Sequence, residues 1–179
     1  YSSPPSNLSH WRVSVPRARF VFSPLKAIAA LALGAAVSIS PAALAADNPF
    51  PQLAGTWSGS GTAQFDGGKT ESLRCKGYYT NTGGANNLGL SIRCANASAK
   101  VELRANLAYA NGNVSGDWEE RTYNQSGSVS GKASSNRLSL SISGGITGSM
   151  NVSIAGGTHQ VSVSTGGPTL KGIHISMSR

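Results

Sequence analysis

The chain has 179 residues and a formal net charge of +8, with 15 Lys and Arg against 7 Asp and Glu. Because four of the cations precede residue 46, the remainder holds 11 cations against all 7 acids and is only mildly basic. This balance gives no sign of the strongly basic surface typical of nucleic-acid binding. The part after residue 45 is rich in Gly, Ser and Asn and poor in Leu, Glu and Lys, which disfavours helix.

The first 45 residues have the pattern of a secretory signal. Four basic residues precede the apolar run 27–39, namely Arg12, Arg17, Arg19 and Lys26. Ala43-Leu-Ala45 then has small residues where a signal peptidase reads them, so we expect cleavage after Ala45 and a periplasmic or secreted protein. The run is shorter than the roughly 20 residues of a membrane span, which is the alternative. Because the basic region is long and no Met precedes Met150, we expect residues 1–20 to lie upstream of the natural translation start.

Residues 46–54 form a short N-terminal arm before the first expected strand. The segment Asn48-Pro-Phe-Pro-Gln52 suits a linker, because proline keeps a chain extended.

From residue 55 onward, apolar and polar residues alternate in short segments, which is typical of half-buried β-strands. The glycine pairs 67–68, 83–84, 144–145, 156–157 and 166–167 separate several of these segments, and we expect each pair to adopt positive φ in a turn. The fold class is therefore all-β. We expect eight to ten strands, near residues 56–65, 70–79, 88–95, 100–109, 113–123, 127–134, 137–143, 146–155, 159–165 and 171–178.

The two cysteines of the chain, Cys75 and Cys94, lie in two of these alternating segments. If residues 70–79 and 88–95 pair as a hairpin with the cysteines opposite each other, the apolar residues of both fall on one face. Directly opposed Cα atoms suit a disulfide, and an oxidising compartment would form it. The alternative, a redox-active pair, lacks the Cys-x-x-Cys arrangement.

Residues 100–123 form the clearest hairpin. Asn111-Gly112 favours a type I′ turn, in which both central residues have positive φ. A turn there pairs opposite charges across the hairpin, Glu102 with Arg121 and Arg104 with Glu119. Continued through a turn at Ala97-Ser98, the register aligns Lys76, Arg93, Glu102 and Arg121 in one outward row. We interpret this row as a solvated charge ladder, with an anion or partner site as the alternative.

The later segments form hairpins with turns at Ser135-Asn136 and Gly156-Gly157, and serine dominates their second face. No connection is long enough for a Greek-key return or a helical crossover. A meander of this length leaves two exposed edges unless it closes. We therefore predict an antiparallel up-and-down barrel over residues 55–179, with a strongly curved open sheet as the alternative.

An even number of strands brings both ends of this domain together, so Trp57 and Arg179 should be neighbours. With Gly55-x-Trp57 opening the first strand and Arg179 ending the last, the chain resembles the calycins, the group of lipocalin-like and avidin-like barrels. The resemblance implies that the basic residue packs over the Trp, and that Gly55, Trp57 and Arg179 are structural. The biotin ligands of avidin and the middle lipocalin signature are absent. The chain also resembles small exported proteins of Gram-negative bacteria.

The expected inward set mixes many glycines and alanines with large apolar residues. Small side chains in a barrel can leave room for one small ligand. Alternatively, the glycines permit tight coiling and the larger side chains fill the interior. Glu120 falls inward, where it either anchors the polar end of a ligand or lies at the rim, and His159 is interpreted as a packed or rim histidine. The candidate ligand-binding residues are Trp57, Tyr79, Tyr109, Trp118 and Glu120.

The sequence supplies little catalytic chemistry, with no His and Cys cluster at metal-ligand spacing and no nucleophile elbow. We expect no enzyme activity, no cofactor, no metal site, no nucleic-acid partner and no membrane span after signal removal. The favoured function is a soluble exported barrel that binds a small apolar or amphipathic ligand. One alternative is a protein-binding module, similar to calycin-like periplasmic protease inhibitors that use their N-terminal segment as a plug. This resemblance would make Asn48-Pro-Phe-Pro-Gln52 a plug instead of a linker. The other is a small outer-membrane barrel, although the two lipid-facing aromatic girdles are missing.

Overall fold

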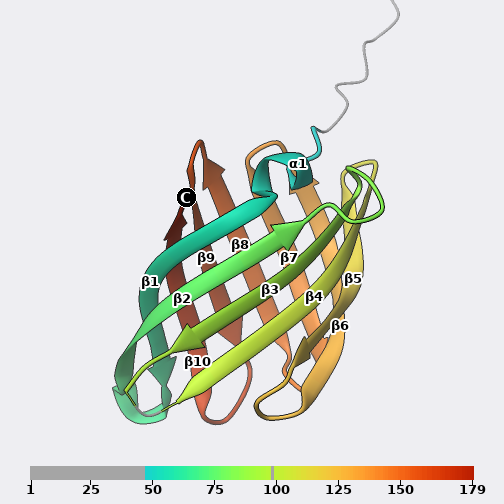
Figure 1. The fold of residues 1–179 in the computed structure, drawn as a ribbon. Helices are drawn as coiled ribbons and strands as arrows, with labels where there is room; N and C mark the ends of the chain where they lie inside the picture. Colours follow the sequence, from blue (N-terminus) through green and yellow to red (C-terminus); the bar gives the residue numbers. More distant parts are fainter. Residues whose placement is uncertain (1–46, 98) are drawn as a thin grey trace, which may run out of the picture. The chain divides into compact units, whose positions relative to one another are not determined.

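The computed structural model describes residues 47–97 and 99–179. Within these residues, ten strands form one closed antiparallel barrel in chain order, as Figure 1 shows. The strands are β1 (Gly55–Phe65), β2 (Thr70–Thr80), β3 (Asn87–Ala95), β4 (Lys100–Ala110), β5 (Asn113–Glu120), β6 (Gln125–Ser134), β7 (Arg137–Gly144), β8 (Gly148–Ala155), β9 (Thr158–Thr165) and β10 (Leu170–Ser178). The pairing of β1 with β10 closes the barrel. The predicted all-β up-and-down barrel is confirmed, whereas the expected signal at 1–45 and the turn residue Ser98 lie outside the described residues.

The strand register follows the alternation of the sequence. In the β4–β5 hairpin, Arg104 lies opposite Glu119, as predicted, and Ala105 lies opposite Trp118 on the other face. Between these strands, Asn111 has a φ of 49° and Gly112 a φ of 80°, the two positive values that a type I′ turn requires. The period-two pattern therefore identified which side of each strand faces inward.

The end of β5 differs from the prediction, because the strand stops at Glu120 instead of residue 123. The Glu120 carboxylate accepts hydrogen bonds from the backbone N–H groups of Thr122 at 2.9 Å and Tyr123 at 2.7 Å. Asn124 then adopts a φ of 53°. These bonds fold the chain into a turn before β6, although the residues of this turn continue the alternating pattern of β5.

The expectation of positive φ at every glycine pair is wrong in part. Both glycines of 67–68 and of 83–84 have positive φ, but only the first of 144–145 and of 156–157 does. Neither Gly166 nor Gly167 has positive φ. Gly166 instead donates its N–H to the Thr147 carbonyl oxygen at 3.0 Å, and Pro168 restricts the residue before it to extended conformations.

The N-terminal arm packs against one end of the barrel, which we call the α1 end. There the short helix α1 (Phe50–Leu53) buries Phe50 completely and leaves Leu53 only 3% exposed. Asn48 holds this turn by accepting the Phe50 N–H at 3.0 Å and by donating to the Ala85 carbonyl oxygen at 2.8 Å. Figure 1 shows α1 at the end where β10 also finishes. No helix of the described part is long and apolar enough to cross a membrane.

Candidate functional site

Trp57 is the centre of an aromatic cluster at the α1 end. Its side chain is fully buried, and its Nε1–H donates to the Leu53 carbonyl oxygen at 2.7 Å, which ties α1 to β1. The Arg179 guanidinium lies 4.5 Å from the centroid of the Trp57 ring, a distance at which a cation is attracted to the ring face. Gly55 has a φ of 137°, and a Cβ there would approach the Arg179 guanidinium to 3.8 Å. The expected contact between the two ends of the domain is therefore present.

His159 and Tyr79 supply polar atoms to the same cluster. The His159 ring meets the Trp57 ring edge-on with 4.4 Å between centroids, and its Nε2 lies 3.2 Å from the Tyr79 hydroxyl, within hydrogen-bonding distance. Burial, and then the positive charge of Arg179, lower the pKa of His159 to about 4. Burial also raises the pKa of Tyr79. Both side chains are therefore neutral at neutral pH, and His159 Nδ1 is buried without a hydrogen-bond partner among the described residues.

We expect His159 to make the free energy of unfolding fall between pH 6.5 and pH 4. The unfolded chain has the ordinary histidine pKa of 6.5 and the folded protein one of about 4, so the unfolded state binds more protons over this range. The contribution of neutral His159, at most about 3 kcal/mol, is fully present above pH 6.5 and is lost by pH 4. Thermal unfolding of the wild type and of His159→Gln across this range measures it. The wild type should lose more of its Tm on acidification than His159→Gln does.

The matched control for this measurement is His174→Gln. His174 is exposed on β10 and contacts Ser162 rather than the interior. Its replacement should leave the wild-type pH dependence unchanged. Parallel curves for the wild type and His159→Gln would contradict the assignment of the acid-sensitive step to His159.

The inward side chains are buried to different extents along the barrel. Those near the α1 end are buried: Trp57, Tyr79, Leu88, Tyr109, Val114, Leu138, Ile154, His159 and Met177. Farther along the strands the burial is mixed. Cys75, Ala105, Trp118, Val129, Leu140 and Val152 are buried, whereas Leu90, Ile92, Leu103, Ile142, Met150, Val161, Ile173 and Ile175 are partly exposed. A core packed at ordinary density would bury residues in the middle of its strands. The interior is therefore most completely buried at the α1 end and less uniformly buried farther along the strands.

The inward glycines have a steric role. A Cβ at Gly59 would lie 2.0 Å from the Ser176 carbonyl oxygen, and a Cβ at Gly116 would lie 2.1 Å from that of Asn106. The backbone of the neighbouring strand thus occupies the space that a side chain would need. These glycines permit tight coiling and leave no room for a ligand at their own positions.

The candidate ligand-binding residues do not gather in one place. Trp57, Tyr79 and Tyr109 belong to the α1 end, where Tyr109 meets the Phe50 ring edge-on at 6.0 Å between centroids. Trp118 lies farther along β5 and is 7% exposed, with its Nε1–H donated to the Ser143 carbonyl oxygen of β7 at 3.1 Å. Its indole therefore spans β6 and forms part of the interior wall.

Glu120 is buried, and its carboxylate is occupied by backbone groups. Burial raises its pKa, but hydrogen bonds from the N–H groups of Tyr123, Thr122 and Glu102 outweigh this effect and hold the pKa below its ordinary value. The bond from Glu102 is 3.1 Å long. Glu120 therefore stabilises the turn after β5, and its geometry fits the rim interpretation rather than that of a ligand anchor.

Two residues of the α1 end had no role in the sequence interpretation. Phe50 and Met177 are among the largest fully buried side chains of the described residues. The sequence did contain a sign that Phe50 is buried. It lies between two prolines, and a large aromatic side chain is unusual in an exposed linker. The packed position of His159 agrees with its sequence interpretation, but its contact with Tyr79 was not predicted. That contact joins β2 to β9 across a separation of 80 residues.

Cys75 and Cys94 form the predicted disulfide between β2 and β3. They are directly opposed in the ladder, with Cα atoms 4.1 Å apart. On the outer face of the same strands, Lys76 lies opposite Arg93, and Arg93 lies opposite Glu102 on β4. The predicted order of the charged row is thus present as far as β4.

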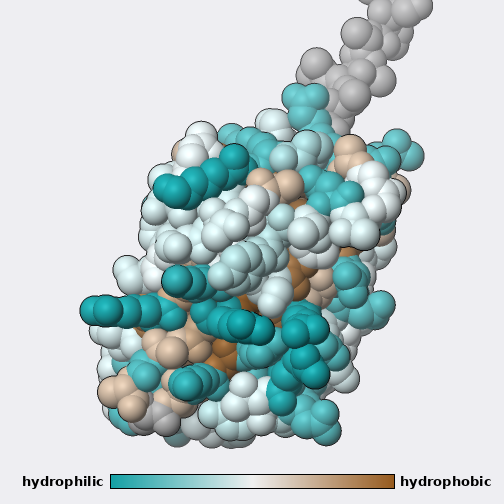
Figure 2. Space-filling view, viewed as in Figure 1, coloured by the Kyte–Doolittle hydropathy of each residue, from teal (hydrophilic) through white to brown (hydrophobic). Residues whose placement is uncertain are grey.

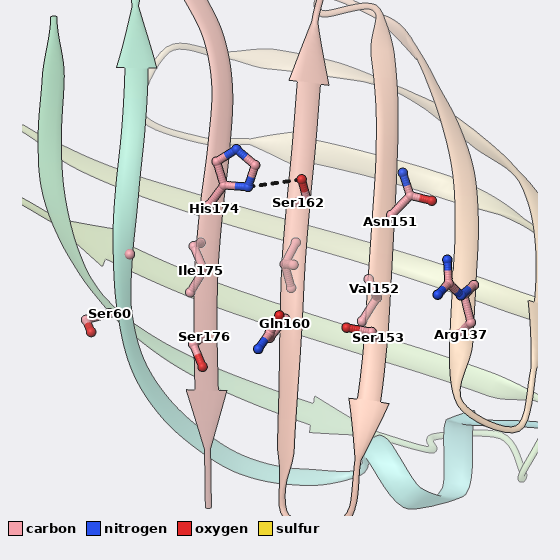
Figure 3. A pocket seen from close by; sticks show the side chains of 12 residues that line it. Ser60, Arg137, Asn151, Val152, Ser153, Gln160, Ser162, His174, Ile175 and Ser176 are labelled. Carbon is pink, nitrogen blue, oxygen red and sulfur yellow. Dashed lines mark hydrogen bonds between the residues drawn. The ribbon is translucent and has the colours of Figure 1, made fainter.

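A shallow hollow of about 370 Å³ lies on the outer face of β7 to β10 and β1, and Figure 3 shows its lining. Hydroxyl and amide side chains predominate, with Arg137 as a charged member. His174 Nδ1 lies 3.1 Å from Ser162 Oγ. No carboxylate lines the hollow to orient the imidazole, so this pair lacks the arrangement of nucleophile, base and acid that activates a serine.

Comparison with known proteins finds similarity in structure only. No family model and no curated protein sequence matches the chain. The crystal structure of Rv2717c from M. tuberculosis aligns with a TM-score of 0.60 at 13% identity, over 72% of this chain and 92% of that one. The S-type phycobiliprotein lyase CPES from Guillardia theta aligns with a TM-score of 0.50 at 8% identity, over 73% of this chain and 89% of that one. The likeness is one of fold.

Proposed function

We propose that the barrel binds a small apolar or amphipathic molecule in its interior, as a calycin-like binding protein without catalytic activity. The observation that carries the proposal is the set of partly exposed apolar side chains in the middle of the barrel, such as Ile92, Ile142 and Val161. Water forms no hydrogen bonds with such a surface. Binding of an apolar ligand that covers it is favoured by about 25 cal/mol for each Å² of apolar surface removed from solvent. A barrel of eight or more strands is wide enough to hold one small ligand.

The α1 end determines how such a ligand would lie. Phe50 and Trp57 close this end, so the ligand occupies the interior beyond them. Tyr79 and His159 are the polar members of the closed end, whereas the partly exposed inward side chains farther along are apolar. The ligand would therefore be mainly apolar, with any polar group at one of its ends.

We also propose that the protein is exported to the periplasm or secreted. Residues 1–45 have the pattern of a secretory signal. The Cys75–Cys94 disulfide fits an oxidising compartment, because disulfides seldom persist in a reducing cytoplasm. The two features are independent, since the cysteines lie in the barrel and the signal precedes it.

The alternative functions are less well supported. A protease-inhibitor-like module needs a free N-terminal arm, but Phe50 and Leu53 are buried in the barrel to which they belong. An outer-membrane barrel needs an outward apolar band. The outward positions of β6 to β9 are instead largely serine, with lysine, arginine, asparagine, glutamine and threonine among them.

A fluorescence titration tests the proposed binding. The neutral probe N-phenyl-1-naphthylamine should bind the full chain saturably, with a rise in probe emission. Val161 is inward on β9 and pairs with Ile175 and Val152, so Val161→Trp places an indole in the interior where the ligand is proposed to bind. We expect this change to weaken probe binding at least about tenfold, which corresponds to about 1.4 kcal/mol.

The matched control is Gln160→Trp, which adds the same ring to the outer face of the same strand. It should leave probe affinity unchanged. If Val161→Trp lowers the Tm strongly, Ile142→Phe with Ser141→Phe as its control repeats the comparison with a smaller increase in volume. Equal affinity of inward and outward variants, or no saturable probe signal in the wild type, would overturn the proposal.

A further inference from the structure

A second hollow, of about 670 Å³, lies on the outer face of β1 to β3, and we call it the basic hollow. Small β1 residues form one side of it, and long side chains from β2 and β3 form the other. Its lining consists of Ser58, Gly59 and Ser60 on β1, Arg74, Cys75, Lys76 and Tyr78 on β2, and Arg93 on β3. Figure 2 shows strongly hydrophilic side chains over the half of this face farther from α1.

The strand register explains why a hollow forms between these strands. Ser58 pairs with Lys76, and Ser60 pairs with Arg74, so each long cation stands beside a short hydroxyl. Gly59 lies between the two serines and adds no side chain. On its other edge, β1 meets Ser176 and Ser178 of β10, which are short as well. The cations of β2 therefore border a floor of backbone and hydroxyl groups.

All charged residues that line the basic hollow are positive. Lys76 lies directly opposite Arg93, an arrangement that destabilises an antiparallel ladder. Arg74 and Lys76 form no ion pair with any described residue. Arg74 and Lys76 therefore have no acidic partner in the described part of the chain, although positions on the neighbouring strands could have carried one.

Glu102 does not remove this excess of positive charge. Its carboxylate lies 3.5 Å from Arg93, but also 2.9 Å from Arg104 and 3.9 Å from Arg121. Glu102 is therefore shared among three guanidinium groups, and the second nearby acid, Glu119, lies 3.9 Å from Arg121 and forms no ion pair with Arg93. The shared acid also lies outside the lining of the hollow.

We propose that the basic hollow binds a ligand through its phosphate groups. A phosphate group carries a charge of about −1.5 to −2 and three acceptor oxygens, and it can accept hydrogen bonds from several directions. Arg74, Lys76 and Arg93 supply charged donors from two strands, and the serine hydroxyls supply neutral donors from a third. A carboxylate has two oxygens, which one arginine satisfies in a bidentate pair, so it would not engage all three strands.

Tyr78 indicates that the ligand extends beyond the phosphate. Tyr78 lines the same hollow and is 46% exposed. Among the described residues, it and Tyr123 are the two large hydrophobic residues that are exposed. The Tyr78 ring can contact an apolar or sugar portion attached to the phosphate. The basic hollow lies outside the barrel, so this site is separate from the interior ligand and does not depend on it.

Binding measurements on the full chain at about 0.15 M salt test the proposal, because lower ionic strength would exaggerate surface charge. One arm uses sodium tripolyphosphate in calorimetry. The other uses vesicles of phosphatidylcholine with and without phosphatidylglycerol. The test variant is Arg74→Gln with Lys76→Gln. The control is Lys132→Gln with Lys171→Gln, which removes the same charge from β6 and β10.

We expect the wild type to bind in at least one arm, the test variant to bind at least about tenfold more weakly, and the control to stay within about twofold. Binding of tripolyphosphate identifies a free phosphate compound as the source. Binding only to phosphatidylglycerol vesicles identifies a lipid headgroup. The proposal is overturned if neither probe binds, or if both double variants weaken binding equally, because net charge alone would then explain the effect.

Discussion

Trp57→Ala is expected to lower the free energy of unfolding by about 3–5 kcal/mol, which is the usual cost of truncating a fully buried tryptophan. Its fully buried indole contacts Tyr79, His159 and the Arg179 guanidinium. It also donates its Nε1–H to the Leu53 carbonyl oxygen at 2.7 Å. The substitution therefore leaves a cavity and frees α1 from β1. Urea denaturation followed by circular dichroism measures the loss.

Two further variants separate this role from a general effect of aromatic truncation. Tyr123→Ala removes a ring that is 60% exposed, so it should change the free energy of unfolding by less than about 0.5 kcal/mol. Trp57→Phe keeps an aromatic ring but loses the hydrogen bond to Leu53, and should cost less than the alanine variant. It remains informative if Trp57→Ala fails to fold. Equal values for Trp57→Ala and Tyr123→Ala would contradict a central role of the indole in closing the barrel.

Local pattern determines much of this fold, which is why the strands and their register could be predicted. The alternation of β4 and the turn at Asn111-Gly112 together specify which residues oppose each other. The cysteine pair follows from the same reasoning one hairpin earlier. Each of these statements concerns strands that are neighbours in the sequence, so errors in one hairpin do not affect another.

The candidate site was harder to predict because it depends on closure of the whole barrel. Tyr79 and His159 come together only because β1 lies between β2 and β10 in the closed order. If the predicted number of strands were wrong by one, Tyr79 and His159 would no longer be predicted to lie side by side. The burial of Phe50 likewise depends on the width of the barrel at its α1 end, and this width cannot be predicted from a local pattern of residues.

The hydrogen bonds that polar side chains make to backbone groups could not be predicted from the alternation either. Glu120 has inward parity and follows Trp118, so the alternation alone suggests a carboxylate inside the barrel. In the structure its oxygens accept three backbone N–H groups, and the strand ends there. The sequence contains the carboxylate but does not show which backbone groups lack partners.

Loss of the disulfide has the second large expected effect. Replacing Cys75 and Cys94 together by alanine should lower the free energy of unfolding by about 3 kcal/mol in the chain-entropy model, for residues separated by 19 positions. The two residues already oppose each other in the β2–β3 ladder, so the bond adds little order to the folded barrel. Its main effect is to restrict the unfolded chain. Guanidinium denaturation of the wild type and the double variant measures the difference.

Dithiothreitol provides an internal control for this prediction. It should lower the denaturation midpoint of the wild type to that of the double variant and leave the variant unchanged. A wild type that is insensitive to reduction would contradict the prediction. Because small domains have only about 5–15 kcal/mol of stability, a loss of about 3 kcal/mol in a reducing compartment raises the unfolded fraction more than a hundredfold. The barrel should therefore be much more stable in an oxidising compartment than in a reducing one, which fits the proposed location.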